Sequence, residues 1–254
     1  MHGPSIHDVA ATARRLRLTD GRAAAKAHVE AESATERFAR DPAAQLALGG
    51  LYTELGFADE AEAAFRAALA LKPGSITARN AIATLLLERG QPDAAVAELA
   101  RLVDEQPRQA LFLSNLLLTS QYVPGVTAES LFDLHKLWRA RFPAPTPLAA
   151  TPRDPDPERK LTVAFLSADF AHHAVGYFMR PLFAALTPDR CRLIAIASGA
   201  RRDAVTPLFA ALAHDWHDVG EKPDAEVAAL VASLGVDVLV DMAGHTAGNR
   251  LGVF

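Results

Sequence analysis

Three side chains able to hold or exchange a proton near neutral pH lie in one short segment. Asp169, His172 and His173 follow an apolar run at residues 161–167 and precede a helical pattern at residues 176–186. An imidazole can act as a general base or orient a substrate hydroxyl. A carboxylate four residues earlier can hold that imidazole in one tautomer. The alternative is that Asp169 only caps the turn and that both histidines are solvated.

The apolar run before these residues has the length and β-branched composition of a strand buried on both faces. In α/β proteins, ligands bind where such a parallel strand ends in a loop before a helix. We therefore expect the loop with Asp169, His172 and His173 to be part of a site.

A second loop of interest contains Gly244, His245 and Thr246 and follows a strand expected at residues 236–242. Glycine at 244 and 248 lets the backbone come close to a phosphate or a sugar. The loop is neither a Walker loop, since it has no Gly-Lys-Thr, nor a Gly-x-Gly-x-x-Gly fingerprint. It is a candidate for substrate binding.

A metal site could also be drawn from His214 and His217, with His172 and Asp215 as further ligands. Their spacing matches no zinc pattern, and a helix-to-strand corner explains the pair more simply. Cys191 is the single cysteine, which excludes an intrachain disulfide. We therefore expect no metal ion. The sequence also lacks the Gly-x-Ser-x-Gly motif of acyl transferases.

Strand and helix patterns alternate through residues 161–254. Strands are expected at residues 161–167, 192–198, 217–219 and 236–242, and helices at residues 176–186, 203–213 and 224–234. This alternation predicts a parallel sheet with right-handed crossovers. With only three or four strands laid down, we expect the front part of a longer polypeptide, or one piece of a cut one.

The first 141 residues contain a repeat with a period of 34. Residues 42–75 and 76–109 carry small and large side chains at matching positions: Gly49 and Ala83, Tyr52 and Leu86, Gly56 and Gly90, Ala61 and Ala95, Phe65 and Leu99, Ala68 and Leu102, Pro73 and Pro107. This period is that of the tetratricopeptide repeat, two antiparallel helices per unit. Small residues let the helices approach, and proline ends the second helix.

Further helical pairs are expected at residues 6–40 and 110–142, and a stiff, proline-rich linker at residues 142–160. The expected fold class is α + α/β. A tetratricopeptide-like solenoid at residues 1–141 precedes an α/β domain with a parallel sheet at residues 161–254. The helical stack either presents a groove to a protein partner or acts as a structural wedge.

Composition excludes some classes of protein. The net charge of −4 over 254 residues argues against a basic nucleic-acid-binding face. No apolar run approaches the length of about 18 residues that a membrane span requires, and the N-terminus has no signal-peptide core. We expect a cytoplasmic protein with no nucleic-acid or membrane partner.

Two segments together carry a family resemblance. Ser-x-Asp-Phe-x-x-His at residues 167–173 and Asp-Met-x-Gly-x-Thr-x-Gly-x-Arg at residues 241–250 occur in this order behind tetratricopeptide repeats. The chain resembles the bacterial protein O-linked N-acetylglucosamine transferase family along essentially its whole length. The repeats alone are unspecific, whereas the two segments are much more specific.

The resemblance implies the N-terminal half of a GT-B fold, in which two Rossmann-like lobes enclose the active site. It implies transfer of N-acetylglucosamine from UDP-GlcNAc to Ser or Thr hydroxyls of an acceptor protein, with inversion and without a metal or other cofactor. Asp169 and His173 match the family's active-site Asp and His, with His173 as base or sugar ligand. The roles of His172 and His245 stay open, and Tyr122 lies about where the repeats send a residue to the cleft.

The second lobe, which in this family makes most contacts to uridine and pyrophosphate, is absent from the sequence and is an expected partner. One alternative is a tetratricopeptide interaction scaffold whose α/β domain is catalytically inactive. Another is a metal-dependent hydrolase that uses the five histidines of residues 161–254.

Overall fold

The computed structural model describes residues 4–143 and 154–254, so the centre of the expected linker, residues 144–153, lies outside the described residues. The chain forms two compact units, Met1–Leu131 and Phe132–Phe254. Helix α9 (Ala128–Arg141) runs mostly in the second unit, whereas the sequence pattern groups it with the repeats. None of the helices within the described residues is long and apolar enough to cross a membrane.

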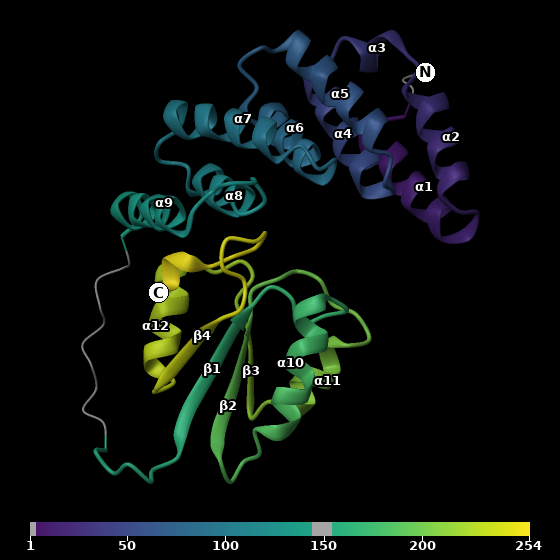
Figure 1. Cartoon of the computed structure of the whole chain (residues 1–254). Helices are drawn as coiled ribbons and strands as arrows, with labels where there is room; N and C mark the ends of the chain where they lie inside the picture. The colour runs from purple at the N-terminus through teal and green to yellow at the C-terminus, as the bar shows by residue number, and fades with distance from the viewer. Residues whose placement is uncertain (1–3, 144–153) are drawn as a thin grey trace. The chain divides into compact units, whose positions relative to one another are not determined.

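The first unit is built from consecutive helices that pack in pairs, α1 with α2, α4 with α5 and α6 with α7 (Figure 1). The helices are α1 (Ile6–Thr19), α2 (Arg22–Ser33), α3 (Glu36–Ala39), α4 (Pro42–Leu55), α5 (Ala58–Leu71), α6 (Ile76–Glu88), α7 (Pro92–Glu105) and α8 (Ala110–Ser120). Both copies of the 34-residue repeat are therefore helical pairs. The short α3 has too few turns to produce a periodic pattern, and the sequence did not predict it.

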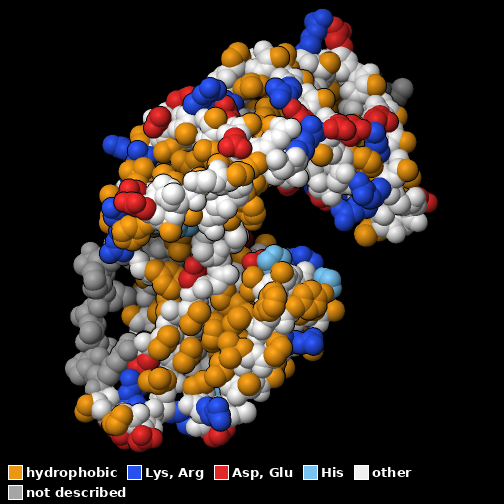
Figure 2. Space-filling model, in the orientation of Figure 1, with side chains coloured by type: hydrophobic (Ala, Val, Ile, Leu, Met, Phe, Trp, Pro, Cys, Tyr) orange, Lys and Arg blue, Asp and Glu red, His pale blue; other side chains and the backbone are white. Residues whose placement is uncertain are grey.

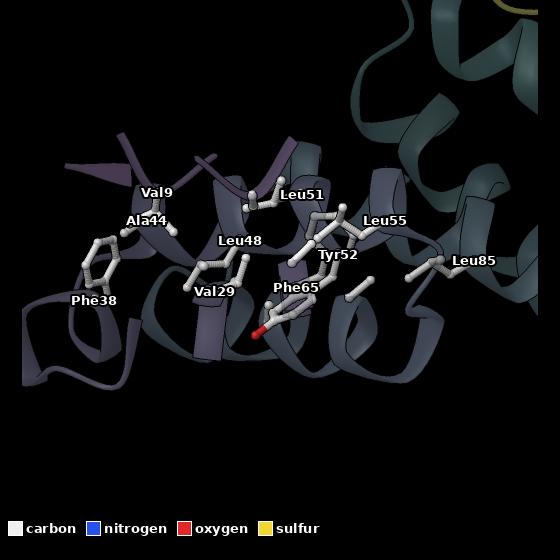
Figure 3. Packing of buried hydrophobic residues seen from close by; sticks show 14 of the residues in the cluster. Val9, Val29, Phe38, Ala44, Leu48, Leu51, Tyr52, Leu55, Phe65 and Leu85 are labelled. Atoms are coloured by element: carbon white, nitrogen blue, oxygen red, sulfur yellow. The ribbon is translucent and has the colours of Figure 1, made fainter. Parts of the chain in front are cut away.

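Complementary side-chain sizes hold each pair together. In the first repeat, a Cβ added to Gly49 of α4 would lie 2.4 Å from the ring of Phe65 on α5, so only glycine fits against this ring. The second repeat has Ala83 and Leu99 at the same positions, and both are buried. Where alanine replaces glycine on the first helix, the smaller leucine therefore replaces phenylalanine on the second. Figure 3 shows Phe65 within the buried cluster that also contains Tyr52 and Leu55.

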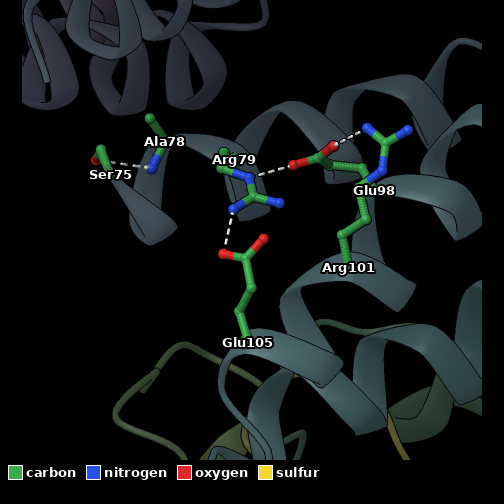
Figure 4. A network of polar contacts seen from close by, with 6 residues as sticks. All are labelled: Ser75, Ala78, Arg79, Glu98, Arg101 and Glu105. Atoms are coloured by element: carbon green, nitrogen blue, oxygen red, sulfur yellow. Dashed lines mark hydrogen bonds and ion pairs between the residues drawn. The ribbon is translucent and has the colours of Figure 1, made fainter. Parts of the chain in front are cut away.

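A polar network joins α6 to α7 in the second repeat (Figure 4). Arg79 of α6 binds Glu98 and, at 2.6 Å, Glu105, both on α7, and Glu98 also contacts Arg101. The Arg79 side chain is only 15% exposed, and its hydrogen bond to Glu105 raises its pKa. The pair between Arg79 and Glu98 is largely shielded from solvent, at 15% and 20% exposure, and it links the two helices of the repeat.

The second unit contains a parallel sheet with the strand order β3-β2-β1-β4. Its strands are β1 (Leu161–Ser167), β2 (Cys191–Ala197), β3 (Asp215–Asp218) and β4 (Val238–Asp241). β1 pairs with β2 from Leu161↔Cys191 onward and with β4 from Val163↔Val238 onward. Each strand begins and ends within two residues of its predicted bounds, and the expected α + α/β fold class is confirmed.

Helices cover both faces of this sheet (Figure 1). α10 (Ala174–Ala185) and α11 (Thr206–Leu212) bury Phe183 and Phe209 against Phe165 on one face. α12 (Asp224–Ser233) buries Val227 against Ala164 and Ile194 on the other face. Because alternate residues of a strand point to opposite faces, the unbroken apolar runs of β1 and β2 serve both layers.

The helix predicted at residues 203–213 is shorter in the structure, because its first residues form a turn. Asp203 accepts hydrogen bonds from the backbone N–H groups of Val205, through its carboxylate, and Thr206, through its carbonyl. A side chain that bonds two residues ahead favours a turn over a helix. The helix α11 therefore begins at Thr206.

Candidate functional site

The strand order places the two candidate loops on neighbouring strands. After β1 the chain crosses to β2 and β3 on one side, and it then returns to place β4 on the other side of β1. The loops after β1 and β4 therefore leave adjacent strand ends in opposite directions. This reversal is the topological switch point at which open α/β sheets bind ligands, outside the carboxyl ends of the strands.

The two loops touch at Ala168, the first residue after β1. A Cβ added to Gly248, in the loop after β4, would lie 2.9 Å from the Cβ of Ala168. A Cβ added to Gly199, after β2, would lie 2.0 Å from the Ala168 carbonyl oxygen. The loops after β1, β2 and β4 thus pack closely together at Ala168. A larger residue at either glycine would displace the segment that carries Asp169.

His173 is the N-cap residue of α10. Its ring Nδ1 accepts a hydrogen bond from the backbone N–H of Val175 at 3.3 Å. A neutral imidazole that accepts at Nδ1 carries its hydrogen on Nε2. His173 therefore presents an N–H donor to whatever lies beyond Nε2. Figure 2 shows histidine side chains grouped on the surface at this end of α10.

Asp169 lies beside this ring without the hydrogen bond of a catalytic triad. Its Oδ2 is 3.7 Å from Nδ1 of His173, and Nδ1 already accepts from the backbone of Val175. The Asp169 side chain is 23% exposed, and its backbone N–H donates to the hydroxyl of the buried Ser167 at 2.9 Å. The turn is closed by Ala171, whose N–H donates to the Asp169 carbonyl at 2.7 Å.

His172 points its side chain toward α10 and its backbone toward the loop after β2. Its Nε2 is hydrogen-bonded to the hydroxyl of Tyr177, and the two rings meet edge to face at 5.2 Å. Its backbone N–H donates to Oδ2 of Asp203 at 2.8 Å. That hydrogen bond is the main cause of the lowered pKa of Asp203. Both rings of the pair are exposed.

The loop after β4 is organised by Asp241. Its two carboxylate oxygens accept from the N–H groups of Ala243, at 3.1 Å, and Gly244, at 2.8 Å. Gly244 has a φ of +55° and an open space where a side chain would stand. The hydroxyl of Thr246 donates to the Ala243 carbonyl at 2.7 Å, so this side chain closes the turn in the present arrangement.

His245 packs against α9. Its ring lies 5.2 Å from the ring of His135 and 5.5 Å from that of Trp138. The pKa of His245 is lowered from 6.5 to about 4, mainly by burial and also by the charge of His135, while Asp241 opposes the shift. The ring is therefore neutral at neutral pH and can bind a substrate only as an uncharged donor, acceptor or apolar surface.

The remaining candidates lie elsewhere. Tyr122 belongs to the first unit, directly after α8, and is 61% exposed. His214 accepts at Nδ1 from the N–H of Leu193 at 3.0 Å, which ties it to β2, and His217 lies on β3. Among residues 4–143 and 154–254 no group of three or more His, Cys, Asp or Glu side chains is arranged to hold a metal ion.

Two polar residues of this region were not predicted from the sequence, Asp203 and Tyr177. Asp203 follows the predicted second strand, so its place at the carboxyl end of a strand was a usable signal. Its bond to His172 joins residues 31 positions apart and leaves no local pattern. Tyr177 stands in an apolar helix, where an aromatic residue is ordinarily taken for core.

Comparison with known proteins supports the helical repeats and the family resemblance. A family profile described as "Tetratricopeptide repeat" matches residues 58–114, which run from α5 into α8. Two plant proteins, each named "Probable UDP-N-acetylglucosamine--peptide N-acetylglucosaminyltransferase SPINDLY", are 29% identical over 143 residues. The protein from Arabidopsis thaliana aligns with 54% of this chain and 16% of its own length, and that from Hordeum vulgare with 54% and 15%.

The structural comparison extends over both units. A mutant O-GlcNAc transferase from Thermobaculum terrenum matches 98% of this chain with a TM-score of 0.80 at 27% sequence identity. The resemblance to the O-GlcNAc transferase family is confirmed. This chain spans 48% of that O-GlcNAc transferase and about a sixth of the plant relatives.

Proposed function

We propose that this chain is the N-terminal part of an inverting glycosyltransferase. The enzyme would transfer N-acetylglucosamine from UDP-GlcNAc to Ser or Thr hydroxyls of an acceptor protein. One observation carries the proposal: the loops with Asp169 and His173, and with Gly244 and His245, leave adjacent strands at the switch point of the sheet. The likeness to O-GlcNAc transferases supports the reaction class.

In this proposal the second unit is the first lobe of a GT-B fold. A second lobe closes the site and supplies the donors and positive groups that stabilise charge on the departing UDP. The repeats bind the acceptor protein, and Tyr122 contacts the substrate from the end of that region. Gly244, His245 and Thr246 line the sugar or phosphate side. The reaction uses no metal ion and no cofactor.

His173 acts either as a hydrogen-bond donor or as a general base, and the two roles differ in which ring nitrogen carries the hydrogen. With Nδ1 accepting from Val175, Nε2 donates a hydrogen bond to an oxygen of the sugar or the acceptor. Removing a proton from the acceptor hydroxyl with Nε2 requires the ring hydrogen on Nδ1 instead. Asp169, 3.7 Å from Nδ1, is the carboxylate that would then accept a hydrogen bond from Nδ1–H. The observed arrangement favours the donor role.

Substitutions at His173 test the proposal without confusing chemistry with folding. His173→Ala removes both the imidazole and the helix cap, which alone costs about 1 kcal/mol. His173→Asn keeps a cap, because Asn is among the best N-cap residues. We expect both variants to lose about 10²–10⁴-fold in transfer rate, a range that covers the loss of a positioned hydrogen-bond donor as well as that of a general base. His7→Ala, at an exposed histidine of the first unit, is the matched control.

The assay follows labelled N-acetylglucosamine from UDP-GlcNAc onto a test protein, with this chain alone and within a longer polypeptide that adds a second lobe. A near-normal rate in His173→Asn would remove His173 from the reaction. No sugar transfer by the longer wild-type polypeptide would favour the scaffold with an inactive α/β domain. Loss of transfer after treatment with EDTA would contradict the metal-free mechanism.

A further inference from the structure

Asp203 divides its two carboxylate oxygens between two tasks. Oδ1 accepts from the N–H of Val205 at 2.9 Å and closes the turn before α11. Oδ2 accepts from the backbone N–H of His172 at 2.8 Å, in a loop that lies 31 residues earlier in the chain. Arg201 adds an ion pair to Oδ2 at 3.3 Å. The first task is a local turn, but the second joins two loops at the same edge of the sheet.

The bond to His172 adjoins the residue that faces the chemistry. His172 is followed directly by His173, whose ring position depends on the start of α10. The same segment is held at its other end by Ser167, which accepts from the N–H of Asp169 at 2.9 Å. The segment between Asp169 and His173 is therefore held at both ends, by a buried hydroxyl and by a carboxylate from the loop after β2.

We infer that Asp203 is a positioning residue for transfer, holding the His172–His173 backbone where the acceptor and sugar must meet it. The inference rests on the proposed function. Asp203 touches no substrate in this account and acts through the segment it holds. Sugar transfer loses rate steeply when a catalytic group moves by about an ångström, whereas the fold tolerates such a shift. The main effect of losing the tether is therefore on catalysis.

The charge of Asp203 gives the tether a spectroscopic signature. The hydrogen bond from His172 lowers the pKa of Asp203 below its usual 3.8. The amide proton of His172 will therefore shift as pH falls through that lowered pKa, because protonation weakens the acceptor. A carboxylate that only supported folding elsewhere would not move this amide signal.

Two substitutions separate the tether from the local turn. Asp203→Ser keeps a short side-chain oxygen that can cap the turn at Val205 but cannot reach His172. Asp203→Asn keeps the size but has a single acceptor oxygen for the two N–H groups. Asp215→Asn is the control, since Asp215 is also paired with an arginine, Arg192 at 2.6 Å, but lies at the start of β3, away from these loops.

The test has two parts. In this chain, hydrogen exchange at the His172 amide should become about tenfold faster or more in Asp203→Ser, and stay unchanged in Asp215→Asn. In the longer enzyme, kcat should fall about 10- to 100-fold in both Asp203 variants, with KM for UDP-GlcNAc within about twofold of wild type. Far-UV circular dichroism checks that each variant is folded.

Each outcome decides something. Unchanged exchange at His172 in Asp203→Ser means that the tether does not exist in solution. Faster exchange with an unchanged kcat means that the tether does not position the reacting groups, and the inference is overturned. If the longer wild-type enzyme makes no product, the proposed function fails, and the proposed role of Asp203 in transfer fails with it. The exchange rate of the His172 amide still shows whether the hydrogen bond to Asp203 exists in solution.

Discussion

Lowering the pH should loosen the second unit through a single ring, that of His245. Its pKa is lowered to about 4 by burial against α9, while an unfolded histidine titrates near 6.5. At pH values between these two pKa values, His245 is mostly protonated in the unfolded chain and mostly neutral in the folded chain. The free energy of unfolding therefore falls as pH drops through this window, and this contribution is complete at neutral pH.

The size of the effect follows from the two pKa values. At pH 4.5 the two titrations together lower the free energy of unfolding by at most about 2–3 kcal/mol. His245 is half-buried, so solvent reduces this figure, and we expect a loss of about 1–2 kcal/mol between pH 7 and 4.5. His135 on α9 and Asp241 on β4 face the ring, the first opposing its protonation and the second favouring it.

His245→Phe keeps an aromatic ring against Trp138 but removes the titration. Urea unfolding is followed by Trp138 fluorescence, with Trp216→Phe introduced in both proteins so that one indole reports. The difference in unfolding free energy between wild type and variant should change by about 1–2 kcal/mol from pH 7 to 4.5. Ionisable groups that do not face the ring contribute equally to both proteins and cancel, whereas the interactions of His135 and Asp241 with His245 are part of the measured difference. Parallel pH profiles would refute the assignment of a buried, neutral His245.

Two further substitutions test the packing of each unit. Gly49→Ala should lower the free energy of unfolding by about 1 kcal/mol in the wild type, because the added Cβ meets Phe65. In a Phe65→Leu background it should raise that free energy by some tenths of a kcal/mol, because the higher helix propensity of alanine then dominates. Urea unfolding of the four proteins measures both effects, and equal effects in the two backgrounds would contradict the prediction. Asp237→Ala should cost about 3 kcal/mol, because the side chain is 6% exposed, pairs with Arg159 at 2.7 Å and accepts from the N–H of Thr162. A thermal unfolding midpoint within about 2 °C of wild type would show that this pair does not support β4.

Local sequence patterns predict much of the fold. The 34-residue period places Gly49 opposite Phe65 and Ala83 opposite Leu99 because packing between paired helices repeats with the chain. The unbroken apolar runs of β1 and β2 indicate burial on both faces, which requires covering helices. Asp169 and His173 are recognisable because their spacing and their place after a strand are properties of a few consecutive residues.

The chemistry of the site depends on contacts that no local pattern contains. Nothing in the spacing of residues 169–173 says that Nδ1 of His173 is taken by the backbone of Val175 rather than by Asp169. The neutrality of His245 follows from its burial against a helix more than a hundred residues earlier.

By itself the sequence determined which segments are helices and strands and which loops carry the polar residues, because periodicity and turn chemistry act between near neighbours. Only the tertiary structure decided that β4 lies beside β1 and that Asp203 reaches His172. Strand order is set by the burial and loop constraints of the whole sheet, and ring protonation is set by what surrounds the ring in space.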